Sequence, residues 1–330
     1  MHSTKPLLTI AIPTYNRSSS INELLSHLAP QLKGVSSVEL IISDNASTDS
    51  TPSVVEHFQC SGVALTYLRN ETNLGMDGNF LQCFERARGK YVWLIGDDDV
   101  LVPGGLQKIL KSLTHGDFDL VYVASYSFEG AYVPAAANKQ PPAAIMSTAL
   151  QYVQRVNVAL TFLSGNIVNK DRVISVAHPP FSTLDGSKLI QLGWTYTLLR
   201  NFTEGLIINE PLIAARAGNT GGYAVFTVFG VSLRRITEDW LIEPALVRVM
   251  LSGTIHFFLP WFLLLMKSRP NTFEDEDVYI VLKGAYGDQF QYWLFNYAII
   301  KLPRLLAKAW FLLGKVLLKV DGWIGSPIFG

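Results

Sequence analysis

Three consecutive carboxylates, Asp97, Asp98 and Asp99, follow an apolar segment at residues 91–95 that is typical of a buried β-strand. Adjacent carboxylates repel one another, and a divalent cation relieves that repulsion. A Mg²⁺ site usually takes one or two carboxylates and completes its shell with substrate phosphates and water. The triplet therefore predicts a metal site for a nucleotide diphosphate. The alternative is a solvated acidic turn with Asp99 near a helix start, where negative charge is favourable.

Polar clusters also follow two other apolar segments of the strand type. These are residues 13–17 after the segment at 7–12, and Asp44 with Asn45 after the segment at 38–43. In open α/β sheets, ligands bind beyond the carboxyl ends of the strands. Three polar clusters at one sheet edge therefore predict one binding site.

The elements that position these clusters alternate between strands and helices over the first 125 residues. The predicted strands are residues 7–12, 38–43, 64–68, 91–95 and 120–124, and predicted helices follow Ser20, Ser47, Phe80 and Pro103. Ser20 and Glu23 have the spacing of a capping box for the first helix. The alternation predicts an α/β fold with a mostly parallel sheet flanked by helices. Neither a G-x-G-x-x-G nor a G-x-x-x-x-G-K-[ST] motif occurs, which disfavours dinucleotide oxidoreductases and P-loop enzymes.

The overall composition excludes several classes of partner and site. Among 330 residues, 27 Lys and Arg balance 27 Asp and Glu, so charge gives no argument for nucleic acid. Only two cysteines occur, Cys60 and Cys83, and the six histidines lack ligand spacing. A reducing compartment is expected, and no cleaved secretion signal is expected at the N-terminus.

Four segments, in this order, resemble the motifs of the family 2 glycosyltransferases. They are residues 12–17 (Ile-Pro-Thr-Tyr-Asn-Arg), residues 43–49 (Ser-Asp-Asn-Ala-Ser-Thr-Asp), Asn73-Leu74-Gly75 with Asn79, and Gly96 with the aspartate triplet. The resemblance covers about the first 125 residues. It implies a catalytic domain of the GT-A fold, a nucleotide-sugar donor of the CDP, UDP or dTDP type, and Mg²⁺ or Mn²⁺ as cofactor.

The resemblance also implies roles for individual residues. The base and ribose of the nucleotide would be held by Pro13, Thr14, Tyr15, Arg17, Asp44 and Asn45. Asn73 and Asn79 match positions that line the donor pocket, although loop and helix capping is the plainer explanation for asparagines there. Asp97 or Asp98 would hold the ribose side. Asp99 would bind the metal, with Asp97 as a second ligand in this Asp-x-Asp motif.

Two later segments resemble a narrower subgroup, the O-antigen abequosyltransferase-like enzymes. They are residues 162–169 (Phe-Leu-Ser-Gly-Asn-Ile-Val-Asn) and residues 219–223 (Asn-Thr-Gly-Gly-Tyr). This resemblance implies transfer of a deoxyhexose to a lipid-linked oligosaccharide in bacterial O-antigen (lipopolysaccharide) synthesis, with inversion at the anomeric carbon.

Two segments of the sequence could supply the catalytic base. Family enzymes usually carry it about 90 residues after the metal motif, and Asp185 lies 86 residues after Asp99. An ordinary turn aspartate before Gly186 is the alternative. Glu238-Asp239 resembles the family pair more closely, but Asp239 comes 140 residues after Asp99. Asp185 is the preferred candidate.

The last third of the chain predicts contact with a membrane. Residues 249–266 form an 18-residue stretch without charged side chains, which is long enough to span, although His256 and Pro260 weaken that reading. In the tail, basic residues recur on one helical face beside apolar ones: Lys301, Arg304, Lys308, Lys315 and Lys319. This pattern favours a helix lying on anionic lipid; the alternative is a surface helix packed on the domain.

The predicted organisation is a glycosyltransferase domain at 1–235, followed by a helical, membrane-associating region at 236–330. Within the first, residues 1–125 form the nucleotide-sugar half and residues 126–235 the acceptor half. The expected location is the cytoplasmic face of the bacterial inner membrane, as a peripheral or monotopic protein. Two other functions stay open: a catalytically silent nucleotide-sugar-binding or scaffold subunit, and a nucleotidyltransferase.

Overall fold

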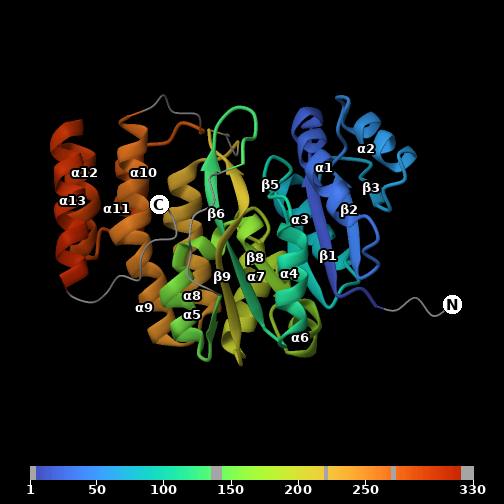
Figure 1. Cartoon of the computed structure of the whole chain (residues 1–330). Coiled ribbons are helices and arrows are strands. Elements are labelled where there is room, and N and C mark those ends of the chain that lie inside the picture. The colour runs from blue at the N-terminus through green and yellow to red at the C-terminus, as the bar shows by residue number, and fades with distance from the viewer. Residues whose placement is uncertain (1–4, 135–142, 219–221, 269–272, 321–330) are drawn as a thin grey trace. The chain divides into compact units, whose positions relative to one another are not determined.

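The computed structural model describes residues 5–134, 143–218, 222–268 and 273–320. The chain forms two compact units. The first contains Met1–Ala149 and Leu160–Ala217, and the second contains Leu150–Ala159 and Gly218–Ile328. Figure 1 shows strands in the first unit and helices in the second. Each unit is described by itself below.

In the described residues, the first unit is built on one nine-stranded sheet (Figure 1). Its strands are β1 (Leu8–Thr14), β2 (Val38–Asp44), β3 (Thr66–Arg69), β4 (Tyr91–Leu94), β5 (Val100–Leu101), β6 (Leu120–Phe128), β7 (Ala144–Met146), β8 (Asn166–Asn169) and β9 (Gly205–Arg216). They lie in the order β3-β2-β1-β4-β8-β6-β9-β5, with β7 also on β9. The predicted α/β fold is confirmed.

The sheet is mixed, and four of the five predicted strands form one parallel part of it. Strands β3, β2, β1 and β4 pair in parallel, as does β6 with β9. Strand β8 runs antiparallel between β4 and β6, and the pairings of β5 and β7 with β9 are also antiparallel. The strands after residue 125 are short or interrupted by polar residues, so their pattern gave no strand prediction.

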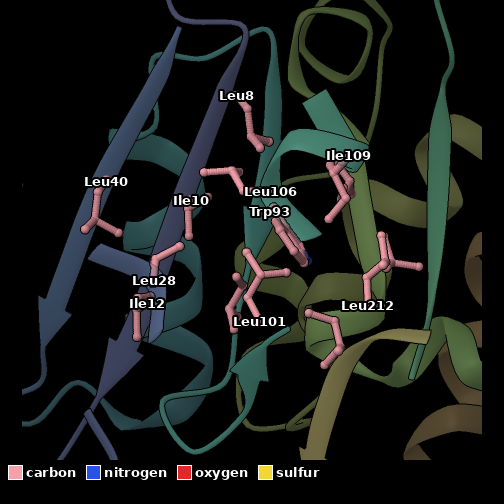
Figure 2. Close-up of a cluster of buried hydrophobic side chains, with 14 of the residues drawn as sticks. Leu8, Ile10, Ile12, Leu28, Leu40, Trp93, Leu101, Leu106, Ile109 and Leu212 are labelled. Atoms are coloured by element: carbon pink, nitrogen blue, oxygen red, sulfur yellow. The ribbon is translucent and has the colours of Figure 1, made fainter. Parts of the chain in front are cut away.

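Helices flank the sheet in the first unit. They are α1 (Ser18–Leu32), α2 (Thr51–Cys60), α3 (Gly75–Arg86), α4 (Gly105–Thr114), α6 (Lys170–Ser175) and α7 (Gln191–Arg200), with 3₁₀ turns η2 (Leu163–Gly165) and η3 (Phe181–Leu184). Alternate residues of β1, Leu8, Ile10 and Ile12, point to one face of the sheet (Figure 2). There they join Leu28 of α1 and Ile109 of α4 in the core, so the period-two pattern of the strand meets the helical faces.

The predicted capping box at Ser20 and Glu23 is wrong. Helix α1 already begins at Ser18, so Ser20 lies inside it. The first backbone N–H groups are satisfied from another segment: Ser18 N donates to Asp49 Oδ2 at 3.0 Å, and Arg17 N donates to Thr51 Oγ1 at 3.2 Å. A distant carboxylate therefore caps this helix, which a local spacing rule does not detect.

The second unit is helical in its described residues. It contains α5 (Ala149–Val156), α8 (Leu233–Trp240), α9 (Pro244–Gly253), α10 (Leu259–Met266), α11 (Val278–Tyr286), α12 (Ala298–Lys301) and α13 (Arg304–Val320), a 3₁₀ turn η1 (Asn157–Thr161), and π-helical turns η4 (Thr227–Ser232), η5 (Thr254–Phe258) and η6 (Tyr292–Tyr297). Its core gathers aromatic and aliphatic side chains such as Phe226, Leu259 and Tyr292.

One described helix, Pro244–Met266, is long and apolar enough to cross a membrane by length and composition. It has 23 residues, and 33% of its most apolar window is buried within the protein. Core helices of soluble proteins pass the same criterion, and Leu259 and Leu263 of this helix do pack in the core of the second unit. Whether the helix spans a membrane therefore stays open.

The compact units divide at residue 217, whereas the sequence analysis placed the boundary at 235. The difference arises because residues 222–235 hold helical turns that pack with the second unit's core, through Val225 and Phe226. The division into a donor half and an acceptor half stays a prediction. In the second unit, Glu276 also accepts hydrogen bonds from Phe226 N and Thr227 N.

Candidate functional site

The parallel strands bring the three polar clusters to one edge of the sheet. Thr14 and Asp44 are register partners at the last positions of β1 and β2. Two residues separate the aspartate triplet from the end of β4, which is the other neighbour of β1. Thr14 Oγ1 donates a hydrogen bond to Asp97 Oδ2 at 2.7 Å, which joins the first cluster to the triplet. The predicted neighbourhood of these residues is therefore present.

The three aspartates differ in their partners. Asp98 Oδ2 lies 3.2 Å from Arg17 Nη1, so this carboxylate has a positive partner from the 13–17 cluster. Asp99 is 5% exposed. Its Oδ2 accepts from Ser164 Oγ at 2.5 Å and its Oδ1 accepts from Arg216 N at 3.0 Å. Asp99 is thus held from both sides by neutral donors.

Ser164 and Arg216 were not predicted, and both support Asp99 from distant positions in the sequence. Ser164 Oγ also accepts from Gly96 N at 2.8 Å, and its carbonyl accepts from Trp93 Nε1 at 2.7 Å. The Arg216 side chain pairs with Glu23 and lies over the Phe128 ring, with 4.5 Å from its guanidinium carbon to the ring centre. The resemblance of residues 162–169 was a signal for Ser164, while no sequence signal pointed to Arg216.

Gly96 leaves no room for a larger residue beside the carboxylates. A Cβ at this position would lie 3.2 Å from Asp98 Oδ1, 3.3 Å from Asp99 Oδ2 and 3.6 Å from Ser164 Oγ. The two distances to the carboxylates are tighter than most contacts of a real Cβ, whereas the distance to Ser164 is an ordinary contact. The glycine therefore lets the carboxylates approach the backbone that ends β4.

Burial leaves negative charge at this edge poorly compensated. Burial first, and then repulsion from Asp98, raises the pKa of Asp97 from 3.8 to about 7. The same two causes raise the pKa of Asp99. The hydrogen bonds from Thr14 and Ser164 act in the opposite direction without cancelling the rise. A divalent cation would supply the missing positive charge.

We expect Asp97→Asn to stabilise the metal-free protein, and to do so more at pH 8 than at pH 5. A carboxyl whose folded-state pKa is raised above its unfolded value costs no stability below the unfolded pKa, and the cost grows as pH rises from 3.8 to about 7. The gain at pH 8 is at most about 4 kcal/mol, since one pKa unit corresponds to about 1.4 kcal/mol, and at pH 5 it is about half of that or less. Urea unfolding with chelator at both pH values measures it, and an equal effect at pH 5 and pH 8 would contradict it.

The residues present fit a metal that is completed by a substrate. The described part of the chain holds no group of three or more His, Cys, Asp or Glu side chains arranged to bind a metal ion. A Mg²⁺-type site needs only one or two carboxylates when substrate phosphates and water fill the remaining positions. Asp99 and Asp97 can supply that donor set, because the pKa values of both buried carboxylates stay raised and nearby groups compensate their charge only in part.

Asp44 and Asn45 are buried at the end of β2 and serve the loops around them. Asp44 Oδ1 accepts from Ser47 N at 2.8 Å, and its Oδ2 accepts from Tyr67 OH at 2.5 Å. Asn45 Nδ2 donates to Asn73 Oδ1 at 2.7 Å, so the second cluster contacts the segment before α3. Tyr67 is a further residue of this edge that no sequence signal marked.

The asparagines near α3 have structural partners, as the plainer explanation expected. Asn73 Oδ1 accepts from Gly75 N at 2.8 Å at the start of α3. Asn79 Oδ1 accepts from Ser43 Oγ at 2.6 Å, and its Nδ2 donates to Ser43 O at 3.0 Å. Both side chains thus fix the sheet edge on which the donor pocket would lie. Their role in lining that pocket stays a prediction.

Residues 13–17 form the turn from β1 into α1. Pro13 is buried within β1, whereas Tyr15 is 44% exposed and presents its ring to solvent. Asn16 has a left-handed backbone with a φ of 52°, and its Oδ1 accepts from Thr48 N at 2.7 Å. The turn thus presents one aromatic ring and one cation, Arg17, beside the carboxylates.

The two candidate bases lie in different units. Asp185 is exposed at the end of η3 in the first unit, where its Oδ1 accepts from Gly186 N at 3.0 Å. Glu238 and Asp239 lie at the end of α8 in the second unit, and Glu238 pairs with Arg234 at 2.8 Å. Asp185 therefore shares a unit with the aspartate triplet, and the assignment of the base stays a prediction.

Comparison with known proteins defines the class of this chain. Residues 9–178 match the family model described as glycosyl transferase family 2, which is more than half of the chain. The chain belongs to this family. All four motifs of the sheet edge lie inside the matched region, as does Ser164.

The curated relatives resemble the chain over one segment. The abequosyltransferase RfbV of Salmonella typhimurium is 41% identical over 115 residues, which are 34% of each chain. The GalNAc(5)-diNAcBac-PP-undecaprenol beta-1,3-glucosyltransferase of Campylobacter jejuni is 30% identical over 112 residues, or 34% of this chain and 36% of the relative. The matches therefore cover about a third of the length of these relatives.

Solved structures share the fold along nearly the whole chain. TarS residues 1–349 of S. aureus, in complex with UDP-GlcNAc, has a TM-score of 0.60 at 17% identity and covers 96% of this chain and 92% of its own. The mannosyltransferase PcManGT of Pyrobaculum calidifontis, in complex with GDP-Man and Mn²⁺, has a TM-score of 0.55 at 16% identity, with 97% and 89% covered. The predicted GT-A fold is thus confirmed.

Proposed function

We propose that this chain is a metal-dependent glycosyltransferase that moves a hexose or deoxyhexose from a nucleotide-sugar donor to a lipid-linked oligosaccharide in bacterial surface polysaccharide synthesis. The observation that carries the proposal is the aspartate triplet at the parallel edge, where burial raises the pKa of Asp97 to about 7. Buried carboxylates with raised pKa values suit a site that binds a cation together with an anionic substrate.

The names of the relatives support the substrate class. One relative is named for abequose transfer and another for glucose transfer to an undecaprenol-linked glycan. Two proteins of the same fold were solved with UDP-GlcNAc and with GDP-Man and Mn²⁺. For this chain, a CDP, UDP or dTDP donor and a lipid-linked acceptor are the proposed substrates.

Each part of the edge has a proposed task. Asp99 and Asp97 would hold Mg²⁺ or Mn²⁺, which would supply positive charge to neutralise the leaving diphosphate. The exposed ring of Tyr15 is available to stack on the base, and Arg17 offers a cation beside Asp98. Asp44 and Asn45 fix the loops beyond β2, and Asp98 is available to the ribose. Pro13, Thr14, Asn73 and Asn79 shape the same pocket.

Transfer needs a base for the acceptor hydroxyl. Asp185 is exposed in the same unit as the triplet, so its carboxylate can accept a proton from an incoming hydroxyl. Attack on the anomeric carbon from the face opposite the diphosphate inverts its configuration. The proton passes to Asp185, and the diphosphate leaves with the electrons of the broken bond.

The test is turnover of a panel of CDP-, UDP- and dTDP-sugars with lipid-linked acceptors, in Mn²⁺ or Mg²⁺ and then in chelator. We expect one nucleotide class to be consumed with metal and spared with chelator. Donor binding without turnover would favour a silent nucleotide-sugar-binding subunit. The absence of binding by every donor would contradict the proposed site.

Helix α13 supports a peripheral position on an anionic membrane, at the cytoplasmic face where nucleotide sugars are made. Its inner face packs into the second unit through Ala307, Trp310 and Phe311. A separate outer face is apolar and exposed: Leu305, Leu306, Leu312, Leu313 and Val316, at 48% to 81%. Arg304 and Lys308 are exposed beside it, whereas the side chain of Lys319 lies outside the described residues. An apolar outer face flanked by cations suits a lipid surface.

We expect the double variant Leu313→Glu and Val316→Glu to reduce binding to phosphatidylglycerol vesicles by about tenfold or more, because two apolar contacts of roughly 1–2 kcal/mol each are lost. Vesicle flotation measures the bound fraction. Ile174→Glu is the matched control, since Ile174 is 63% exposed on α6 of the first unit. Equal loss in the control variant would show that added charge, and not helix α13, determines binding.

A further inference from the structure

The segment that carries Asp185 has a defined backbone. It joins η3 to α7 and comprises residues 185–190. Lys188 adopts a left-handed conformation with a φ of 63°, which an L-residue with a side chain rarely adopts. Ser187 is buried, and its Oγ accepts from Leu189 N at 3.0 Å. Such a backbone persists only when surrounding contacts hold it in place.

Asp77 of α3 supplies those contacts from more than 100 residues away. Its Oδ2 accepts from Lys188 N at 2.8 Å, and its Oδ1 accepts from Ile190 N at 3.3 Å. Both oxygens are therefore used on backbone N–H groups of one segment. Asp77 is 2% exposed, so solvent contributes little to holding these groups.

The surroundings of Asp77 disfavour a charged carboxylate. Burial raises the pKa of Asp77, and the nearby charge of Asp185 raises it further, while the two backbone hydrogen bonds act in the opposite direction. A buried carboxylate that faces a second carboxylate is unfavourable unless its hydrogen bonds compensate. The plainer explanation is that Asp77 only caps the N-terminal end of α7.

We propose that Asp77 is a positioning residue for the transfer reaction. It ties the segment that carries Asp185 to helix α3, and the residues just before and within this helix, Asn73 and Asn79, belong to the proposed donor pocket. The base and the donor pocket therefore share one support. This inference rests on the proposed transfer reaction with Asp185 as its base, and it adds a residue whose side chain contacts neither substrate.

The test compares wild type, Asp77→Asn and Asp77→Ala in steady-state transfer and in amide hydrogen exchange. We expect kcat to fall about 10- to 100-fold in Asp77→Asn, since small displacements of a catalytic group cost that much, with the donor KM within about twofold. Asp77→Ala should lose more, and the asparagine variant is the informative one if the alanine variant fails to fold. The amides of Lys188 and Ile190 should exchange faster.

Asp119→Asn is the matched control. Asp119 is also buried and accepts from two backbone groups, Thr203 N at 2.6 Å and Glu204 N at 3.0 Å, and it pairs with Arg172 as well. It lies just before β6, away from the polar edge. We expect its kcat to stay near the wild-type value once folded protein is counted.

The outcomes separate this inference from the proposed function. A wild-type protein that transfers no sugar overturns both. A wild-type protein that transfers sugar, with Asp77→Asn at full kcat despite faster exchange at Lys188, overturns the positioning role alone. Unchanged exchange at Lys188 and Ile190, or kcat losses that match in Asp77→Asn and Asp119→Asn, also overturns it.

Discussion

In the Asp99→Asn variant, we expect metal-dependent sugar transfer to fall by about 10²- to 10⁴-fold, because a metal that stabilises the leaving diphosphate contributes several kcal/mol. Asparagine keeps an oxygen for Ser164 Oγ or Arg216 N, so the local hydrogen bonds survive in part. The lost property is the negative charge that holds the cation. Steady-state transfer over a range of Mn²⁺ concentrations measures the loss.

Glu39→Gln is the matched control for Asp99→Asn. Glu39 is also a buried carboxylate that accepts from a hydroxyl and a backbone amide, Thr9 Oγ1 at 2.6 Å and Arg88 N at 2.8 Å. It lies near the beginning of β2, whereas the proposed site lies beyond the end of this strand. We expect Glu39→Gln to lose stability without losing metal dependence. Equal transfer rates in Asp99→Asn and wild type would remove Asp99 from the metal site.

The sheet edge could be predicted because its signals are local. Each parallel strand is a short apolar run that stops at a polar cluster, and the chain order of these clusters places them on one edge. The structure joins Thr14 to Asp97 and Arg17 to Asp98, as that argument expects. Five of the nine strands in the described residues were predicted. The ends of β1 to β4 differ from the prediction by two residues or fewer, whereas β6 continues four residues beyond its predicted end.

The support of the site could not be predicted in the same way, because it depends on long-range pairing. Ser164 reaches Asp99 across 65 residues and Arg216 reaches it across 117. Both come from parts of the sheet that the sequence pattern did not resolve, next to β8 and at the end of β9. A single serine or arginine at such distances has no periodicity that would mark it.

The capping box failed for a related physical reason. Ser20 and Glu23 have the required spacing, but Asp49 and Thr51 had already satisfied the N–H groups at the start of α1. Glu23 is instead used by Tyr132 N at 3.1 Å and by the Arg216 guanidinium. Tertiary contacts therefore take the place of the local capping motif. One of these contacts, between Glu23 and Arg216, also connects α1 to the residue whose backbone N–H donates to Asp99.

For Asp185→Asn, we expect kcat to fall by about 10²- to 10⁴-fold, the usual contribution of a positioned general base. Asparagine has the same shape and retains an oxygen for Gly186 N, and the side chain is exposed, so folding should be unaffected. Donor binding should also be unaffected, because the metal and nucleotide positions lie on other segments. Transfer rates together with donor binding by calorimetry measure both quantities.

The double variant Glu238→Gln and Asp239→Asn distinguishes the two candidate bases. Glu238 already pairs with Arg234 in α8. This ion pair explains the presence of a charged residue at the helix end without any catalytic role. We therefore expect kcat to stay within about threefold of wild type, as exposed ion pairs contribute little. If the double variant is inactive and Asp185→Asn is active, the base belongs to the second unit. The hydrogen bonds between Asp77 and the 185–190 segment would then serve folding alone, because this segment would carry no base.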